Sequence, residues 1–287
     1  MSARGPDPAA LTALVALADE ALARRAGLVV LGLAGPQGSG KSTLAAALCR
    51  AMTARGIATA ALSLDDLYHT RAHRLALAAQ VHPLLITRGG PGTHDVALGL
   101  STIAALARGE PARLPRFDKA ADDRWPEADD CAPGPTRLLV FEGWCLGARP
   151  QPADALVHPV NALEANEDRD LVWRTHANAA LAGDYARLWA CIDVLAMLRA
   201  PDFASVVRWR AEQEHVLRQS AGDAPGVMDA PALARFMAHY ERLTRHLLAD
   251  LPDRADLVIA LAADRRVAHV RARKTPGYWA ASSSGSP

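Results

Sequence analysis

A short apolar segment that runs directly into a glycine-rich loop constrains the fold of this chain more than any other feature. Residues 28–34 (LVVLGLA) form a continuous apolar run, which is typical of a parallel strand buried on both faces. The loop GPQGSGKS occupies residues 35–42, and residues 43–55 follow with the pattern of a helix. Glycines in such a loop let backbone N–H groups close around phosphate oxygens at the start of a helix. The arrangement predicts a phosphate-binding site.

The loop fits the pattern G-x-x-x-x-G-K-[ST]. Lys41 would bridge the β- and γ-phosphates of a nucleotide as a catalytic cation, and Ser42 would hold Mg²⁺. We therefore expect ATP and Mg²⁺ as cofactors. The residues expected to bind the nucleotide are Gly35, Pro36, Gln37, Gly38, Ser39, Gly40, Lys41, Ser42 and Thr43. The alternative is a glycine-rich turn that merely precedes a helix.

The rest of the chain alternates between segments typical of strands and segments typical of helices. Further strands are expected at residues 59–64, 138–141, 194–199 and 256–261, with a hairpin partner for the last at 267–273. Further helices are expected at residues 8–25, 95–107, 161–182, 202–220 and 230–251. The alternation predicts an α/β fold of three layers, in which a mostly parallel five-stranded core sheet carries helices on both faces.

A single domain over residues 1–287 is the simplest interpretation, because no linker or internal repeat interrupts the pattern. Long turn-rich stretches inside a compact domain are usually functional, so an excursion at about residues 81–135 is expected to form an acceptor site. A lid is expected at about residues 199–220, and residues 282–287 have the composition of a loose tail.

Composition and charge exclude several classes of partner. The 32 Lys and Arg residues nearly balance the 31 Asp and Glu residues, so no general positive field is available to hold a nucleic acid or an anionic membrane. No apolar run approaches the roughly 20 residues of a membrane helix, and the N-terminus does not have the pattern of a signal peptide. The four cysteines show no C-x-x-C pairing, which favours reduced thiols. We expect a cytoplasmic protein with small-molecule partners. The sequence does not determine its oligomeric state.

Acidic residues follow two of the expected strands, at the sheet edge where ligands of open α/β sheets bind. Asp65 and Asp66 follow the second strand. We expect Asp65 to accept a hydroxyl proton, with metal contact as a further role, and Asp66 to cap the next helix. Glu142, after the third strand, would reach Mg²⁺ directly or through water.

Several motifs along the chain resemble those of the D-glycerate 3-kinases of the plant and fungal type. They are SLDDLY (63–68), RGGPGTHD (88–95), LPRFDK (114–119), FEGW (141–144), PVN (159–161) with Leu163-Glu164, and Trp209-Arg210 with Gln213-Glu214. That family belongs to the group of P-loop kinases that includes uridine kinase, phosphoribulokinase and pantothenate kinase. The resemblance runs from about residue 28 to about residue 273, and it implies a P-loop kinase fold.

The resemblance also implies roles for individual residues. Asp65 matches the catalytic aspartate of the group, Glu142 its Walker B acid, and Arg208 and Arg210 its catalytic lid arginines. Asp118, Lys119 and Arg124 match the substrate-side loop of the family, and Arg88, Thr93 and His94 are further candidates for binding the acceptor. For His94 the alternative is a structural residue that only makes hydrogen bonds within its loop. The family usually has Tyr-Asp-Lys-Ser and then a glycine-rich stretch with Gly-Asp-Arg, whereas this chain has FDKA (117–120) and ADDR (121–124). Two hydroxyl groups are thus absent from the acceptor loop. For each arginine of the lid the alternative is a solvated helix, with pairs such as Arg210 to Glu214.

The expected activity is ATP-dependent phosphorylation of a small hydroxy acid, most of all D-glycerate at its terminal hydroxyl, giving 3-phosphoglycerate. Arg88, Lys119 and Arg124 are candidates for holding the carboxylate, since a small anion needs fixed cations. One alternative acceptor is a nucleoside or a pantothenate-like alcohol, although the only large aromatic residues in the acceptor loops are Phe117 and Trp125. Another alternative is an ATP-binding module or switch that phosphorylates no acceptor.

Overall fold

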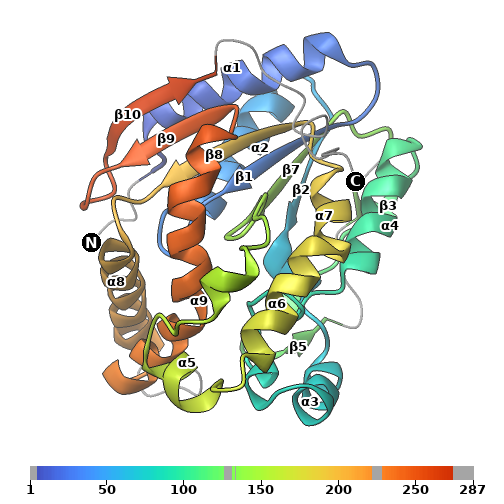
Figure 1. Cartoon of the computed structure of the whole chain (residues 1–287). Helices are drawn as coiled ribbons and strands as arrows, with labels where there is room; N and C mark the ends of the chain where they lie inside the picture. Colours follow the sequence, from blue (N-terminus) through green and yellow to red (C-terminus); the bar gives the residue numbers. More distant parts are fainter. Residues whose placement is uncertain (1–4, 126–130, 133, 222–227, 274–287) are drawn as a thin grey trace.

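The computed structural model describes residues 5–125, 131–132, 134–221 and 228–273. Its centre is a six-stranded sheet in the order β10-β9-β8-β1-β7-β2 (Figure 1). The strands are β1 (Val29–Ala34), β2 (Thr59–Ser63), β7 (Leu138–Gly143), β8 (Val194–Arg199), β9 (Leu257–Leu261) and β10 (Val267–Ala272). The first five are parallel, and β10 runs antiparallel to β9. The expected mostly parallel core of five strands with an edge hairpin is confirmed.

Helices cover both faces of this sheet. They are α1 (Pro8–Arg24), α2 (Lys41–Ala54), α4 (Val96–Ala107), α7 (Asp184–Trp189), α8 (Phe203–Ala221) and α9 (Ala230–Asp250). On one face, α1 and α2 pack against Val29, Leu31 and Leu33 of β1. On the other face, α4, α7 and α9 form a second cluster with Val30. Because successive side chains of a strand point to opposite faces, β1 is buried throughout, and the loop that follows it emerges at the middle of the carboxyl edge.

Between β2 and β7 the chain leaves the sheet and forms the excursion. Its elements are η1 (Leu64–Leu67), α3 (Arg71–Gln80), η2 (Pro83–Ile86), α4, and two short hairpins, β3 (Ala112–Arg113) with β6 (Cys131–Ala132) and β4 (Phe117–Asp118) with β5 (Asp123–Arg124). Helix α3 was not expected from the sequence, and the one residue that it buries fully is charged, Arg74. The Thr70 side chain caps it by accepting a hydrogen bond from the N–H of His73 at 3.3 Å.

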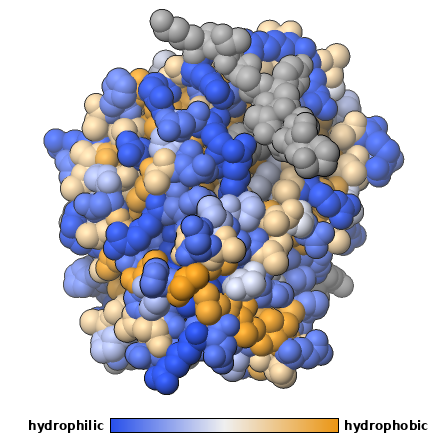
Figure 2. All heavy atoms as spheres, viewed as in Figure 1, coloured by the Kyte–Doolittle hydropathy of each residue, from blue (hydrophilic) through white to orange (hydrophobic). Residues whose placement is uncertain are grey.

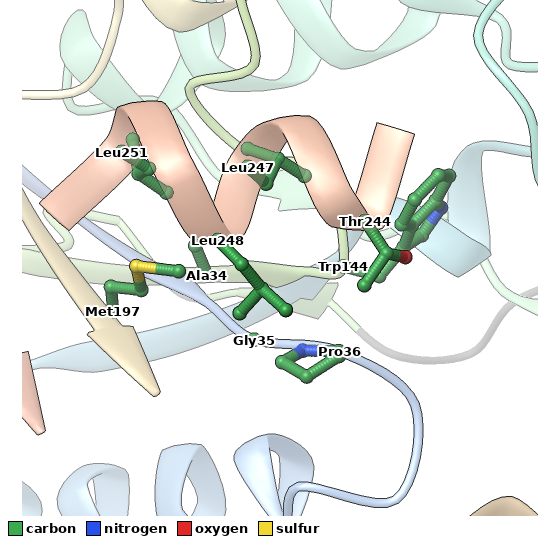
Figure 3. A pocket seen from close by; sticks show the side chains of 9 residues that line it. All are labelled: Ala34, Gly35, Pro36, Trp144, Met197, Thr244, Leu247, Leu248 and Leu251. Atoms are coloured by element: carbon green, nitrogen blue, oxygen red, sulfur yellow. The ribbon is translucent and has the colours of Figure 1, made fainter. Parts of the chain in front are cut away.

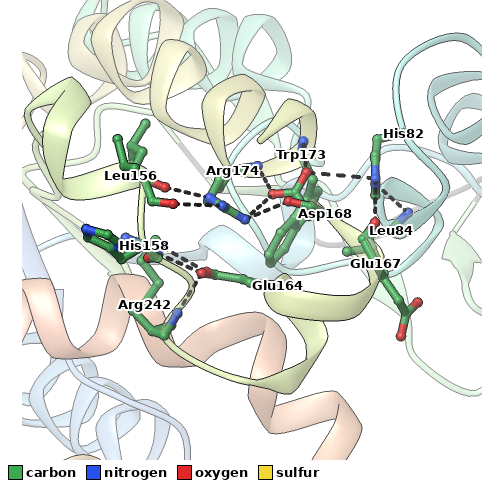
Figure 4. A network of polar contacts seen from close by, with 12 residues as sticks. His82, Leu84, Leu156, His158, Glu164, Glu167, Asp168, Trp173, Arg174 and Arg242 are labelled. Atoms are coloured by element: carbon green, nitrogen blue, oxygen red, sulfur yellow. Dashed lines mark hydrogen bonds and ion pairs between the residues drawn. The ribbon is translucent and has the colours of Figure 1, made fainter. Parts of the chain in front are cut away.

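The single helix expected at residues 161–182 is wrong, because the chain forms α5 (Ala162–Glu167) and α6 (Val172–Ala182) there. The Asp168 carboxylate accepts hydrogen bonds from the N–H of Trp173 at 2.7 Å and of Arg174 at 3.2 Å, and pairs with the Arg174 guanidinium at 3.0 Å (Figure 4). Leu171 reverses the chain with a φ of 61°. A carboxylate that caps a new helix competes successfully with continuation of the old one.

The PVN and LE motifs hold α5 against α9. The Asn161 side chain accepts from the N–H of Glu164 at 3.1 Å and donates to the carbonyl of Ala238 at 2.9 Å. Glu164 is buried and pairs with Arg242 of α9 at 2.7 Å, and Arg242 also donates to the carbonyl of His158 (Figure 4). Since each charge in this network has a partner, the burial of these groups is compensated. These motifs therefore have a structural explanation.

The molecular face seen in Figure 2 is mostly hydrophilic, with one hydrophobic patch in its lower half. None of the helices in the described ranges combines the length and the apolar character that crossing a bilayer requires. The cysteines Cys49, Cys131, Cys145 and Cys191 are free thiols.

Candidate active site

The glycine-rich loop, residues 35–40, connects β1 to α2 at the middle of the carboxyl edge. Gly38 and Gly40 adopt positive φ angles of 74° and 85°, which favour glycine. Within the described chain no side chain caps the start of α2 at Gly40. The backbone N–H groups of its first turn therefore lack intrahelical partners and remain available to an anion.

Two structural elements back this loop. Trp209 of α8 is buried, donates from its indole to the carbonyl of Ala263 at 2.7 Å, and packs directly against Gly38. On the other side lies a small apolar pocket, in which Gly35 and Pro36 lie opposite side chains of α9 (Figure 3). The remaining lining residues are Ala34, Trp144, Met197, Thr244, Leu247, Leu248 and Leu251. The loop is thus supported by packing from α8 and α9.

Ser42, Ser63 and Glu142 gather beside Lys41. The hydroxyls of Ser42 and Ser63 donate to Oε1 of Glu142 at 2.8 Å and 3.0 Å. The Nζ of Lys41 lies 3.9 Å from Oε2 of the same residue. That Oε2 is buried and has no hydrogen-bond partner among the described residues. Hydroxyl and carboxylate oxygens are the ligands that Mg²⁺ prefers, so this group fits the cation expected there.

Asp65 lies in η1, just beyond β2, where the Ser63 side chain accepts a hydrogen bond from its N–H at 3.2 Å. Its Oδ2 pairs with Nζ of Lys119 at 2.6 Å, and its Oδ1 accepts from the hydroxyl of Tyr68 at 2.8 Å. Burial would raise the pKa of Asp65, but the charges of Lys119 and Lys41 hold it well below its ordinary value. Asp65 is therefore an ionised carboxylate at any physiological pH.

Asp66 does not cap the next helix, which is a correction to the sequence-based expectation, because Thr70 does so. Its Oδ1 accepts from the N–H of Phe117 at 3.1 Å, and its Oδ2 pairs with Arg116 at 3.0 Å. Burial raises the pKa of Asp66, and Arg116 opposes that shift. The two adjacent aspartates thus differ: Asp65 faces Lys41 and Lys119, and Asp66 anchors the β4–β5 hairpin to η1.

The β4–β5 hairpin brings Lys119 and Arg124 to the site. Arg124 pairs with Asp95 at 3.1 Å and donates to the carbonyl of Tyr68 at 3.1 Å. The Asp118 carboxylate accepts from the N–H of Ala120 at 2.8 Å and of Ala121 at 3.1 Å. Asp118 therefore stabilises the turn, while the Lys119 side chain next to it reaches Asp65.

Arg74 is a residue that the sequence analysis missed. Its side chain is 1% exposed, pairs with Asp122 at 2.9 Å, and donates to the carbonyls of His69 at 3.2 Å and Ile86 at 2.7 Å. Asp122 also pairs with Arg88, which donates to the carbonyl of Lys119 at 3.3 Å. An arginine in a polar helix gives no sequence signal of burial, because only the folded excursion surrounds it with acceptors.

Thr93 and His94 are buried within the RGGPGTHD loop. The Thr93 hydroxyl accepts from the N–H of Gly89 at 3.0 Å and donates to the carbonyl of Gly90 at 2.7 Å. Nδ1 of His94 is bonded to the hydroxyl of Tyr185, and its Nε2 has no hydrogen-bond partner among the described residues. Burial lowers the pKa of His94 to about 3. Thr93 therefore serves the loop itself, and His94 is a neutral imidazole.

The two arginines expected in the lid, Arg208 and Arg210, make contacts with side chains of α8 and α9. Arg208 donates to the hydroxyl of Ser205 at 2.9 Å. Arg210 pairs with Glu214 at 2.8 Å, and its guanidinium carbon lies 5.7 Å from the ring centre of Phe236. The ion pair between Arg210 and Glu214, given above as the alternative to a lid role for Arg210, is present. Trp209, between these two arginines, packs against the glycine-rich loop at Gly38, and the charges of Asp65 and Arg210 both act on the buried Tyr240. The role of Arg208 and Arg210 in phosphoryl transfer stays a prediction.

The chain has relatives among known kinases, although no protein-family model matches it. It is 35% identical over 227 residues to the uncharacterized kinase mug58 of Schizosaccharomyces pombe, covering 74% of this chain and 78% of the relative. It is 31% identical over 254 residues to the chloroplastic D-glycerate 3-kinase of Arabidopsis thaliana, covering 82% of this chain and 52% of the relative. The chain thus spans about half the length of the chloroplastic enzyme.

Among solved structures, the D-glycerate 3-kinase of Cryptococcus neoformans superimposes with a TM-score of 0.78 at 26% identity, covering 92% of this chain and 99% of that one. The resemblance noted in the sequence motifs is confirmed by these matches. The chain belongs to the family of P-loop small-molecule kinases that includes the D-glycerate 3-kinases, and it is a phosphotransferase with an alcohol group as acceptor.

Proposed function

We propose that this kinase transfers the γ-phosphoryl group of ATP to the terminal hydroxyl of D-glycerate, giving 3-phosphoglycerate. The observation that carries the proposal is the placement of Asp65 between the lysine of the glycine-rich loop and Lys119 of the excursion. A proton acceptor thereby lies next to a cation that an anionic acceptor needs. The relatives named D-glycerate 3-kinase support the choice of acid. The same proposal includes action as a single domain in the cytoplasm.

The nucleotide end of the site consists of the glycine-rich loop, Lys41 and the start of α2. Backbone N–H groups of the loop would bind the phosphates, and Lys41 would bridge the β- and γ-phosphates. Ser42 and Glu142 would hold Mg²⁺, whose chemistry is to neutralise charge on the phosphates. Among the described residues there is no group of three or more His, Cys, Asp or Glu side chains that could hold a metal ion by itself. Phosphate oxygens and water would therefore complete the ligand set, as is usual for Mg²⁺ in kinases.

At the acceptor end, Asp65 would accept the proton of the acceptor's hydroxyl group. The oxygen of that hydroxyl would bond to the γ-phosphorus while the bond between the γ-phosphorus and the leaving ADP breaks. Little covalent assistance is needed, because phosphoryl transfer depends mainly on positioning and charge stabilisation. Lys119 would bind the carboxylate of the acceptor. Arg88 and Arg124, which already pair with Asp122 and Asp95, would position the hairpin and add to the local positive charge.

The test is product detection with ATP and a panel of D-glycerate, glycerol, uridine and pantothenate. We expect phosphorylation of D-glycerate with the largest kcat/KM. Preferred phosphorylation of uridine or pantothenate would overturn the choice of acceptor and leave only a P-loop kinase. The absence of any phosphorylated acceptor, with ATP still bound, would favour a binding module.

A further inference from the structure

Both oxygens of the Asp65 carboxylate already hold hydrogen-bond donors. Lys119 Nζ lies 2.6 Å from Oδ2, and the Tyr68 hydroxyl donates to Oδ1 at 2.8 Å. Each oxygen can accept a second hydrogen bond, but an ammonium on Oδ2 makes that carboxylate a weaker proton acceptor, so transfer of the acceptor's proton to Asp65 is favoured when that donor leaves. The arrangement explains how the site is held before the acceptor arrives, and it leaves open which donor gives way.

Tyr68 is fixed by its surroundings. It is buried, its ring centre lies 5.1 Å from that of Phe117 in an edge-on contact, and 4.7 Å from that of His94. Its backbone carbonyl accepts a hydrogen bond from Arg124. Any displacement of the Tyr68 hydroxyl would disturb this packing, so Tyr68 stays on Asp65.

Lys119 is free to move at its tip. Its side chain is 60% exposed, whereas that of Asp65 is 25% exposed. Its backbone is anchored, because Arg88 donates to its carbonyl at 3.3 Å and the adjacent Asp118 closes the turn. The exposed ammonium can be hydrated when it moves away, and Lys41 still faces the Asp65 carboxylate. The ammonium can therefore leave Asp65 while the hairpin stays in place, provided that another anion takes over the attraction that Asp65 supplied.

The neighbouring cations do not have this freedom. Arg88 pairs with Asp122, Arg124 with Asp95, and Arg74 is enclosed by carbonyls and Asp122. Within the described ranges, Asp65 is the only carboxylate in ion-pair distance of Lys119. An incoming carboxylate can thus capture Lys119 by a simple exchange of one carboxylate partner for another.

We infer that Lys119 is a latch on Asp65 that an acceptor carboxylate releases: the acceptor anion draws the ammonium from Oδ2 and so opens that oxygen to the acceptor hydroxyl. The inference rests on the proposed function and extends it to substrate selection. An acid binds through Lys119 and at the same time activates its own phosphorylation. A neutral alcohol of the same size leaves Lys119 on Asp65. It should therefore have a lower kcat as well as a higher KM than the acid.

The first test compares D-glycerate with glycerol in the wild type and in Lys119→Met. If Lys119 only bound the carboxylate, its removal would leave glycerol turnover unchanged. The latch predicts that Lys119→Met raises kcat for glycerol at least about threefold, while KM for D-glycerate rises about tenfold or more, as expected on loss of one charge-assisted hydrogen bond. An unchanged or lower kcat for glycerol would overturn the inference.

Two variants serve as controls. Lys119→Arg keeps the positive charge and should keep glycerol turnover low. Arg113→Met removes an exposed positive charge from the excursion without touching Asp65, and it should leave the ratio between the two acceptors as in the wild type. A rise in glycerol turnover in Arg113→Met equal to that in Lys119→Met would assign the effect to net charge and overturn the latch.

The second test supplies the acceptor in two pieces, ethylene glycol for the hydroxyl and formate for the carboxylate. Formate should increase phosphorylation of ethylene glycol several-fold by the wild type, saturably, and should have no effect on Lys119→Met. Equal responses in both proteins, or none in the wild type, would overturn the latch even if D-glycerate is a good substrate. If the wild type phosphorylates uridine or pantothenate and no D-glycerate, the proposed function itself fails.

Discussion

A Cβ atom added at Gly38 would lie 2.6 Å from the Cβ of Trp209. This contact joins the glycine-rich loop to α8, and Trp209 is itself held by its bond to Ala263. The first half of α8 is therefore packed on the loop, so a lid at residues 199–220 that moves as a whole would have to carry the loop with it. The shape of the phosphate site depends on this contact.

Gly38→Ala should weaken ATP binding at least about tenfold, because the new methyl group meets Trp209 and the φ of 74° disfavours alanine. Isothermal titration calorimetry with a non-hydrolysable ATP analogue measures the effect. Gly90→Ala is the control, because a Cβ at Gly90 has nothing within 4 Å. Wild-type affinity in Gly38→Ala would show that the contact does not shape the site.

Lys41→Met should lower kcat by roughly a hundredfold or more, since a preorganised cation on the transferring phosphoryl group is worth that much. Its thermal midpoint should stay close to that of the wild type, because the ion pair of Lys41 with Glu142, the one it makes within the described residues, is long at 3.9 Å. Steady-state kinetics and calorimetry report the two quantities. Near wild-type turnover would remove the glycine-rich loop from the mechanism.

A comparison of Asp65→Asn with Asp66→Asn should separate a role in catalysis from a role in stability. Asp65→Asn should lower kcat by roughly 10² or more, as expected for loss of a general base, with ATP affinity little changed. Asp66→Asn should destabilise the protein by about 1 kcal/mol through loss of the charged bond to Arg116 and should raise KM for the acceptor. Urea unfolding and initial rates measure both, and the reverse order of kcat losses would exchange the two roles.

Arg74→Met should destabilise the protein by about 3 kcal/mol or more, because it removes a buried guanidinium with four hydrogen-bonded or ionic contacts. Arg71→Met is the matched control. Arg71 is 60% exposed and lies 3.9 Å from the same Asp122, so its loss should change stability by less than about 0.5 kcal/mol. Similar losses in both variants would contradict the role of Arg74.

Acid should destabilise the fold through His94. Burial lowers its pKa in the folded state to about 3, against an ordinary value of 6.5, so the unfolded chain binds the extra proton between these values and stability falls as pH decreases from about 6.5. From pH 7 to pH 5, His94→Gln should lose about 2 kcal/mol less unfolding free energy than the wild type. Urea titrations at the two pH values measure the difference, and parallel losses would contradict it.

Local sequence patterns were enough to predict the sheet, the glycine-rich loop and the approximate positions of Asp65 and Glu142. Each depends on short-range information: the apolar run of β1, the glycines at positive φ, and acids at or just beyond strand ends. Because the carboxyl ends of parallel strands share one edge of the sheet, acids expected after the second and third strands were predicted to face the loop that follows β1. Asp65 does lie beyond β2, whereas Glu142 lies within β7, one residue before its end. The motif resemblance added the kinase family.

The partners of charged groups were decided only by the tertiary structure. Lys119 lies on Asp65, Asp66 lies on Arg116, and Arg74 is enclosed by carbonyls of the excursion. The break at Asp168 was likewise hidden, because helical periodicity continues through it until the carboxylate caps α6. The sequence pattern around a charged side chain does not identify its partner. The partner is determined when distant segments pack together, because every buried charge then needs a counter-charge or a hydrogen-bond partner.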